Sequence, residues 1–154
     1  MQKKILLFVV LLFLPSCGYE AIYSKKNIMA NNFSISEMSF VGDRKVSLKI
    51  KEKLNNYTIG NNNKKFAVKV SSTSEKIALA KNTAGNNTSF KNTVSINVEV
   101  LMNNNFKNNF MISESFIYKN ASNKFNLKRY ENEIKSNLAE TLSEKLIFRL
   151  SNIQ

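Results

Sequence analysis

The chain has 154 residues and a formal net charge of +12, from 23 Lys and Arg against 11 Asp and Glu. It contains no histidine, one cysteine and four glycines. Without histidine the chain lacks the commonest general base and metal ligand. A lone cysteine excludes an intrachain disulfide and argues against a thiolate zinc site. The sequence also has no glycine-rich phosphate loop. We therefore expect neither an enzyme nor a bound metal or cofactor.

The N-terminal segment has the pattern of a secretory signal. Lys3 and Lys4 precede an uninterrupted apolar run from Ile5 to Leu14, and a small residue, Ser16, follows shortly after. The run is too short for a permanent transmembrane helix, which needs about 20 apolar residues. We expect residues 1–16 to be removed as a signal peptide.

Cys17 stands where a lipoprotein signal would be cleaved. Its context, Leu14-Pro15-Ser16-Cys17-Gly18, resembles a bacterial lipobox, in which the thiol receives a diacylglyceryl group and becomes the acylated first residue of the mature protein. The alternative is an ordinary signal peptide with an incidental cysteine. Lipidation would anchor the protein stably, because two or more acyl chains hold a protein on a membrane. By the same resemblance, Gly18 after the anchor implies the outer membrane, with the chain on its periplasmic side.

A basic protein in the periplasm does not meet nucleic acid in normal life. The acidic partners available there are lipid head groups, the phosphates of lipid A and acidic protein surfaces. A less specific interpretation is that the lysines only solvate the surface of a Lys- and Asn-rich chain.

Residues 17–32 are interpreted as the lipid anchor and a tether, and residues 33–154 as one α+β domain. The domain opens with an alternating strand from Phe33 to Ser36, which Met38 and Phe40 continue in the opposite phase. This change of phase indicates a β-bulge near Glu37.

A helix is predicted after this strand. Asp43 is a suitable N-cap, and the apolar face that follows has spacings of four, four and three: Val46, Ile50, Leu54 and Tyr57. The helix is expected to end in the turn-rich run at residues 60–63.

Three strand patterns follow the helix. The first runs from Lys65 to Leu79, and a polar loop is expected from Ala80 to Asn87. The clearest alternation in the chain runs from Phe90 to Met102 and predicts a half-buried antiparallel strand. After a turn at Asn103 to Asn105, the alternation resumes from Phe110 to Tyr118.

A polar link from Asn120 to Asn126 leads to a final helix of about 20 residues. Its apolar stripe comprises Ile134, Leu138, Leu142, Leu146 and Leu150. Ile147 and Phe148 lie off this stripe, where they either pack against loops or touch a partner. The order strand, helix, three strands, helix predicts a two-layer α+β sandwich, a four-stranded mainly antiparallel sheet with both helices packed on one face.

The final helix carries carboxylates that could be taken for acid–base pairs: Glu131 with Glu133, and Glu140 with Glu144. We interpret them as surface charges, because a general acid needs surroundings that shift its pKa, and we expect Glu131 to form an i,i+4 ion pair with Lys135. Glu37 and Glu114 each interrupt the apolar phase of a strand. Bulges explain these two residues more simply than a buried acid pair does.

The start of the mature chain resembles a known family. The segment Cys17-Gly18-Tyr19-Glu20-Ala21-Ile22-Tyr23 is similar to the Cys-Gly-aromatic-x-Pro-Leu-Tyr opening of the alphaproteobacterial LptE family, the lipopolysaccharide-assembly lipoproteins, with Ala21 and Ile22 in place of Pro and Leu. The long alternating strand, a last strand from Ser113 to Tyr118 and a helix ending in Phe148-Arg149-Leu150 agree with that family in order and spacing.

The resemblance implies an outer-membrane lipoprotein that plugs the β-barrel LptD, helps to assemble it and binds lipopolysaccharide during its insertion. The lumen of such a barrel is polar, which suits a plug with a polar surface. Lysines would hold the lipid A phosphates, and the candidates are Lys81 and Lys91, which flank the polar loop, with Lys119 and Lys124 beyond the last strand. The alternative for each of them is a solvated surface lysine.

Two functions of other classes remain open. The first is a structural accessory lipoprotein of another envelope machine, for barrel assembly or secretion, which would co-purify with a different barrel. The second is a periplasmic lipid carrier, which would need a sizeable apolar cavity.

Overall fold

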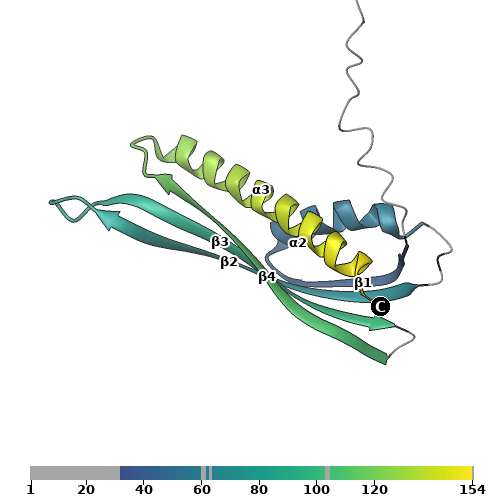
Figure 1. The fold of residues 1–154 in the computed structure, drawn as a ribbon. Helices are drawn as coiled ribbons and strands as arrows, with labels where there is room; N and C mark the ends of the chain where they lie inside the picture. The colour runs from purple at the N-terminus through teal and green to yellow at the C-terminus, as the bar shows by residue number, and fades with distance from the viewer. Residues whose placement is uncertain (1–31, 60–61, 63, 103–104, 154) are drawn as a thin grey trace, which may run out of the picture. The chain divides into compact units, whose positions relative to one another are not determined.

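The computed structural model describes residues 32–59, 62, 64–102 and 105–153. The predicted signal peptide, the lipidation site Cys17 and residues 17–31 of the predicted tether lie outside the described residues. The described elements are β1 (Ser34–Gly42), α2 (Arg44–Leu54), a 3₁₀ turn (Asn55–Tyr57), β2 (Lys65–Lys81), β3 (Asn87–Met102), β4 (Asn105–Lys119) and α3 (Lys124–Ser151). The predicted order of strands and helices is confirmed (Figure 1).

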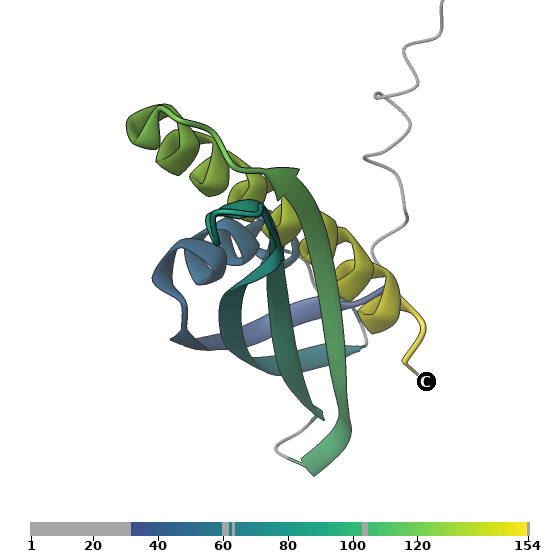
Figure 2. The same cartoon turned by 90° about the vertical axis from the view of Figure 1, so that its left-hand side faces the viewer.

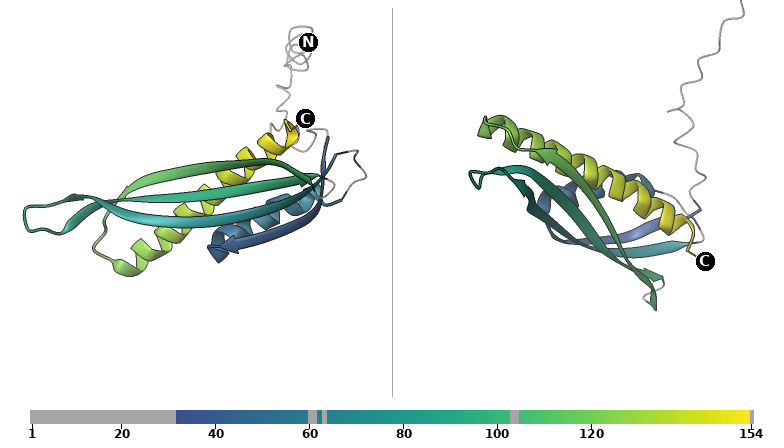
Figure 3. Two further views of the ribbon diagram at one scale, coloured as in Figure 1. Left: turned by 90° about the horizontal axis from the view of Figure 1, so that it is seen from below. Right: turned by 60° about the vertical axis from the view of Figure 1, so that its left-hand side comes forward.

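The four strands form one sheet in the order β1-β2-β3-β4. β1 runs parallel to β2, and the other two neighbouring pairs are antiparallel. Both helices cover the same face of this sheet, with α3 crossing it obliquely (Figures 2 and 3). The predicted α+β sandwich with a mainly antiparallel sheet is therefore confirmed, and β1 and β4 are its two edges.

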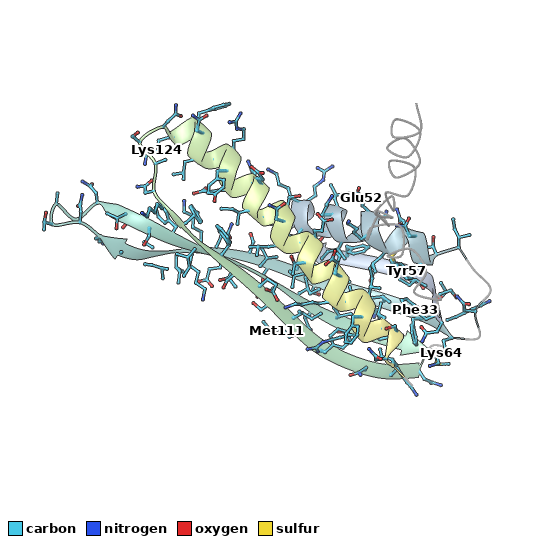
Figure 4. All side chains as sticks on the ribbon, turned by 45° about the horizontal axis from the view of Figure 1, so that its top comes forward. Phe33, Glu52, Tyr57, Lys64, Met111 and Lys124 are labelled. Carbon is cyan, nitrogen blue, oxygen red and sulfur yellow. The ribbon has the colours of Figure 1, made fainter. Side chains whose placement is uncertain are left out.

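The core lies between the sheet and the helices. The side chains of β3 alternate as predicted, with Val94, Ile96, Val98 and Val100 fully buried against the helices. Val46, Ile50 and Leu54 of the predicted helical face are fully buried. The helix ends at Leu54, earlier than predicted, so Tyr57 lies in the 3₁₀ turn, where it stacks on Phe33 with ring centroids 5.1 Å apart (Figure 4). The stripe of α3 from Ile134 to Leu150 completes the second layer.

The connection from β1 to α2 depends on a glycine and a cap. The register of β1 against β2 shifts between Ile35 and Glu37, which confirms the predicted bulge. Gly42 has φ +101°, and a Cβ there would lie 1.9 Å from the carbonyl oxygen of Ser72. Next in the chain, the carboxylate of Asp43 accepts hydrogen bonds from the backbone N–H of Lys45 and Val46, so Asp43 is the predicted N-cap.

The elements at the other end of the sheet are longer than predicted. β2 continues to Lys81, so Ala80 and Lys81 belong to the strand, and the turn is confined to residues 82–86. The side chain of Asn82 closes this turn by accepting hydrogen bonds from the N–H of Ala84 and Asn86. These strand ends escape a pattern-based prediction because no helix covers them, so both faces are exposed and polar residues continue the ladder.

α3 begins at Lys124, within the link that was predicted to run to Asn126, and has 28 residues rather than about 20. Asn123 sets its start, because its side chain accepts a hydrogen bond from the N–H of Asn126 at 3.0 Å. No helix among the described residues is long and apolar enough to cross a membrane.

Candidate functional site: the hairpin end of the sheet

One end of the domain gathers three of the four predicted lysines. We call it the hairpin end: the turn at residues 82–86, the adjoining ends of β2, β3 and β4, and the first two turns of α3. Lys81 pairs in register with Asn87, and Lys119 pairs with Ser89 on the same strand β3. Lys124 begins α3 here and points its Nζ at the side-chain oxygen of Asn120, 3.5 Å away (Figure 4).

Hydrogen bonds fix the geometry of this end. The backbone N–H of Asn120 donates to the carbonyl of Thr88 at 2.8 Å, and its side-chain amide donates to the carbonyl of Asn87 at 2.7 Å. The chain leaving β4 is thereby tied to β3 before α3 begins. As a result Lys81 at the end of β2, Lys119 at the end of β4 and Lys124 at the start of α3 come to the same end of the domain, with β3 between the two strands.

Lys91, the fourth candidate, lies further along β3. Its neighbours in register are Ile77 on β2 and Ile117 on β4, so it sits on the sheet face away from the helices. The structure therefore separates Lys91 from the turn, although the sequence placed Lys81 and Lys91 as equal flanks of one loop.

Two further cations at this end were not among the predicted site residues. Lys128 and Arg129 are exposed in the first two turns of α3. No acidic residue occupies the first turn, so three cations stand near the helix N-terminus, where the helix dipole makes positive charge unfavourable. Within the described part of the chain, none of Lys81, Lys119, Lys128 and Arg129 forms an ion pair.

Apolar side chains are exposed beside these cations. The exposed fractions are 42% for Ile77, 46% for Leu79, 60% for Ile117 and 77% for Phe125. Ile77 and Ile117 flank Lys91 on the sheet face away from the helices, which has no second layer. Beyond them the β2–β3 hairpin extends past the beginning of α3 (Figures 1 and 3). The hairpin end is therefore both cationic and apolar, the combination that an anionic amphiphile requires.

Next to the hairpin end, an ion pair links α3 to the sheet. Glu131 accepts hydrogen bonds from Lys76 on β2 at 2.5 Å and from the hydroxyl of Tyr118 on β4 at 2.8 Å. Burial alone would raise the pKa of Glu131, but the hydrogen bonds from Lys76 and Tyr118 lower it. The predicted pair between Glu131 and Lys135 is wrong, because both side chains turn toward elements packed against the helix.

Lys135 instead bonds the N-cap of α2. Its Nζ lies 2.8 Å from the Asp43 carboxylate, which also accepts from Ser74 at 2.8 Å. Burial raises the pKa of Asp43, but these two hydrogen bonds and the one from the Val46 N–H lower it to about 2.

The remaining predicted carboxylates have structural explanations. Glu37 is exposed at the bulge, as predicted. The bulge predicted at Glu114 is wrong: Glu114 pairs with Val94 in regular register, and its carboxylate forms an ion pair with Lys145 of α3. Glu140 pairs with Lys53 of α2. Within residues 32–153 as described, no three His, Cys, Asp or Glu side chains come together to hold a metal ion.

The fold of the described domain is shared with solved bacterial lipoproteins. The rare lipoprotein B from Shewanella oneidensis matches with a TM-score of 0.60 at 13% sequence identity, covering 75% of this chain and 93% of that one. A minor lipoprotein from Acinetobacter baumannii matches with a TM-score of 0.57 at 11% identity, covering 75% and 90%. Lipoprotein B from Nitrosomonas europaea matches with a TM-score of 0.55 at 11% identity, covering 75% and 83%.

This chain has the fold of these lipoproteins. At such identities the likeness concerns the fold alone. No family model matches the chain, and no curated protein sequence matches it.

Proposed function

We propose that this protein is an outer-membrane lipoprotein of the LptE type, which plugs and helps to assemble the LptD β-barrel and binds lipopolysaccharide through its hairpin end. The observation that carries the proposal is the hairpin end itself, where cations without ion pairs lie beside exposed apolar side chains. Lipid A offers the matching chemistry, because its phosphates are anionic and its acyl chains are apolar.

Two further observations support the proposal. The chain shares its fold with bacterial lipoproteins, and Cys17 follows a signal that resembles a lipobox. The core favours a plug over a lipid carrier, which would need a sizeable apolar cavity. Phe33, Phe66 and Leu142 are at most 2% exposed between the layers, so the sheet and the helices pack directly on each other.

Binding of lipopolysaccharide tests the role of the hairpin end. The triple variant Lys81→Glu, Lys119→Glu and Lys124→Glu should bind lipopolysaccharide at least about tenfold more weakly than the unmodified protein, since each lysine near an anionic lipid surface contributes about 1 kcal/mol. The matched control carries the same change in charge at Lys51, Lys65 and Lys69, which are exposed outside the hairpin end. Equal loss in both variants would mean that net charge alone binds the lipid.

A pull-down tests the partner. The lipidated protein, extracted in mild detergent, should retain LptD, and depletion of the protein should lower the amount of correctly assembled barrel. Recovery of a different barrel would favour the accessory role in another envelope machine, whereas recovery of no barrel would contradict both.

A further inference from the structure

The two edges of the sheet differ in how they are protected. β1 has nine residues, a bulge between Ile35 and Glu37, and a glycine at its end. β4 has 15 residues and pairs with β3 in unbroken register from Asn108 to Lys119. Its other side is a row of backbone groups with no neighbouring strand among the described residues. Such a long, regular edge is a template for another strand unless something covers it.

A groove runs along this free edge, between β4 and α3. One hollow of about 550 Å³ lies between Phe110 on the strand and Phe148 and Arg149 on the helix. A second hollow of about 610 Å³ shares Phe148 and Arg149 with the first and extends to Thr141. A third, of about 230 Å³, shares Thr141 with the second and reaches Phe116. We call this line of hollows the β4–α3 groove.

The groove meets the backbone of the strand as well as its side chains. The middle hollow is lined by four consecutive residues, from Met111 to Glu114. Since alternate side chains of a strand point to opposite faces, four consecutive residues line a hollow only where it lies against the strand's edge. The free N–H and C=O groups of β4 are therefore accessible from the groove.

Large apolar side chains are exposed along the whole groove. The exposed fractions are 59% for Phe148, 64% for Met111, 46% for Phe116 and 43% for Tyr130. Phe148 is the residue for which the sequence left a partner contact open, and it does not pack into the core. A ligand that covers these side chains would make apolar contacts with both β4 and α3.

The charge at one end of the groove selects the occupant. The hollow at the beginning of β4 is lined by two cations, Lys107 and Arg149, and by no acidic residue. The guanidinium of Arg149 lies 5.0 Å from the ring centroid of Phe110 and has no ion pair among the described residues. A second copy of the chain carries the same strongly positive net charge, +12 over the full sequence, which disfavours self-association.

We propose that the β4–α3 groove binds an extended segment of another polypeptide as a fifth strand, with apolar side chains alternating along it and a carboxylate at the Lys107 and Arg149 end. Backbone pairing with β4 would supply affinity, and the hollows against α3 would select every second side chain. This binding mode does not rest on the proposed role in lipopolysaccharide assembly, since its cations, Lys107 and Arg149, lie near the beginning of β4 and the end of α3, whereas the hairpin-end lysines lie at the other ends of these elements.

A designed peptide tests this inference on the full chain in detergent micelles. The probe is a labelled nine-residue peptide that alternates Val or Phe with Thr and ends in two Glu residues. Its first control has the same side chains but N-methyl groups on alternate amides, which remove the hydrogen bonds of one edge. Its second control has Lys in place of Glu. We expect fluorescence anisotropy to show binding of the probe and at least about tenfold weaker binding of each control.

A pair of protein variants locates the site. The double variant Phe148→Ser and Arg149→Glu should bind the probe at least about tenfold more weakly, and the amide resonances that shift in the unmodified protein should lie in β4. The matched control, Leu48→Ser and Lys51→Glu, likewise replaces one large apolar and one cationic side chain, on exposed residues of α2, and should bind normally. Circular dichroism and thermal melts verify that both variants fold.

Five outcomes would overturn the inference, four of them from the peptide experiments. These are no binding of the probe, equal binding of the N-methylated peptide, equal binding by the Phe148→Ser, Arg149→Glu variant, and shifts confined to elements other than β4 and α3. A concentration-dependent dimer that buries β4 in the absence of peptide would also overturn it, because the occupant would then be a second copy.

Discussion

The carboxylate of Asp43 and the ammonium of Lys135 are 2.8 Å apart, although 92 residues separate them in the chain. The contact joins the N-terminus of α2 to the middle of α3. Both side chains are partly buried, with exposed fractions of 19% for Asp43 and 24% for Lys135. Since Asp43 also caps α2 and accepts from Ser74, a single carboxylate fastens both helices to the sheet.

Substitution of Asp43 should therefore be costly and dependent on pH. Asp43→Ala removes the cap and the ion pair, and we expect a loss of about 2–3 kcal/mol in the free energy of unfolding at neutral pH. Because folding lowers the pKa of Asp43 from 3.8 to about 2, its contribution is present above pH 3.8 and is lost as the pH falls toward 2. Urea unfolding between pH 7 and pH 2 measures this, and the difference between wild type and variant should shrink across that interval.

Asp43→Asn is the control, because asparagine can still cap the helix but carries no charge. It should lose less stability than Asp43→Ala. A constant difference between wild type and Asp43→Ala at all pH values would contradict the assignment of the ion pair.

Gly42 and Gly85 form a matched pair of glycines with positive φ, +101° and +79°. At Gly42 an added Cβ would meet the backbone carbonyl of Ser72, whereas at Gly85 nothing lies within 4 Å. Gly85→Ala should therefore cost only the conformational strain, about 1–2 kcal/mol. Gly42→Ala should cost at least about 3 kcal/mol, because the strand end or the start of α2 must move as well. Chemical denaturation measures the free energy of unfolding of both variants. An equal decrease in the two would show that the backbone around Gly42 can shift at little energetic cost.

The fold was accessible to sequence reasoning because its signals are local. The alternation from Val94 to Val100 reports one buried face of a sheet, and Asp43 followed by a periodic apolar face reports a helix start. The bulge at Glu37 appeared as a change of phase in one strand. Each of these signals lies within about ten neighbouring residues, a range over which the period of a helix or of a strand can be recognised in the sequence.

The ion pairs could not be predicted from the sequence, because the choice of partner depends on tertiary packing. Glu131 and Lys135 have the spacing of a helical pair, yet each finds its partner on another element, Lys76 and Asp43. The candidate site could be predicted in part: Lys81, Lys119 and Lys124 do share one end, whereas Lys91 lies away from it and Lys128 and Arg129 were not among the candidates. The β4–α3 groove had only one sequence signal, the position of Phe148 off the apolar stripe.

Lipidation of Cys17 stays a prediction with a direct measurement. The mass of the mature N-terminal peptide should correspond to a chain that begins at Cys17 and carries acyl groups on the thiol and the amine. Cys17→Ser should accumulate as an uncleaved precursor. A mature chain that begins at another residue, or an unmodified thiol in the processed protein, would contradict the lipobox assignment and with it the outer-membrane anchor.

The hydroxyl of Tyr118 tests the ion pair beside the hairpin end. Tyr118 is 5% exposed and donates to the same oxygen of Glu131 that Lys76 contacts. Tyr118→Phe should lower the free energy of unfolding by about 1–2 kcal/mol, since it leaves a partly buried carboxylate with one donor fewer.

Burial raises the pKa of Tyr118, and the hydrogen bond to Glu131 and its negative charge raise it further. The stability that Tyr118 contributes is therefore present below its ordinary pKa of 10.0 and is lost as the pH rises above that value. An absorbance titration of wild type against Tyr118→Phe should show the phenolate of Tyr118 forming only as the protein unfolds at alkaline pH. Its formation in the folded protein near pH 10 would mean that the hydroxyl is open to solvent and that the hydrogen bond to Glu131 does not help to hold α3 on β4.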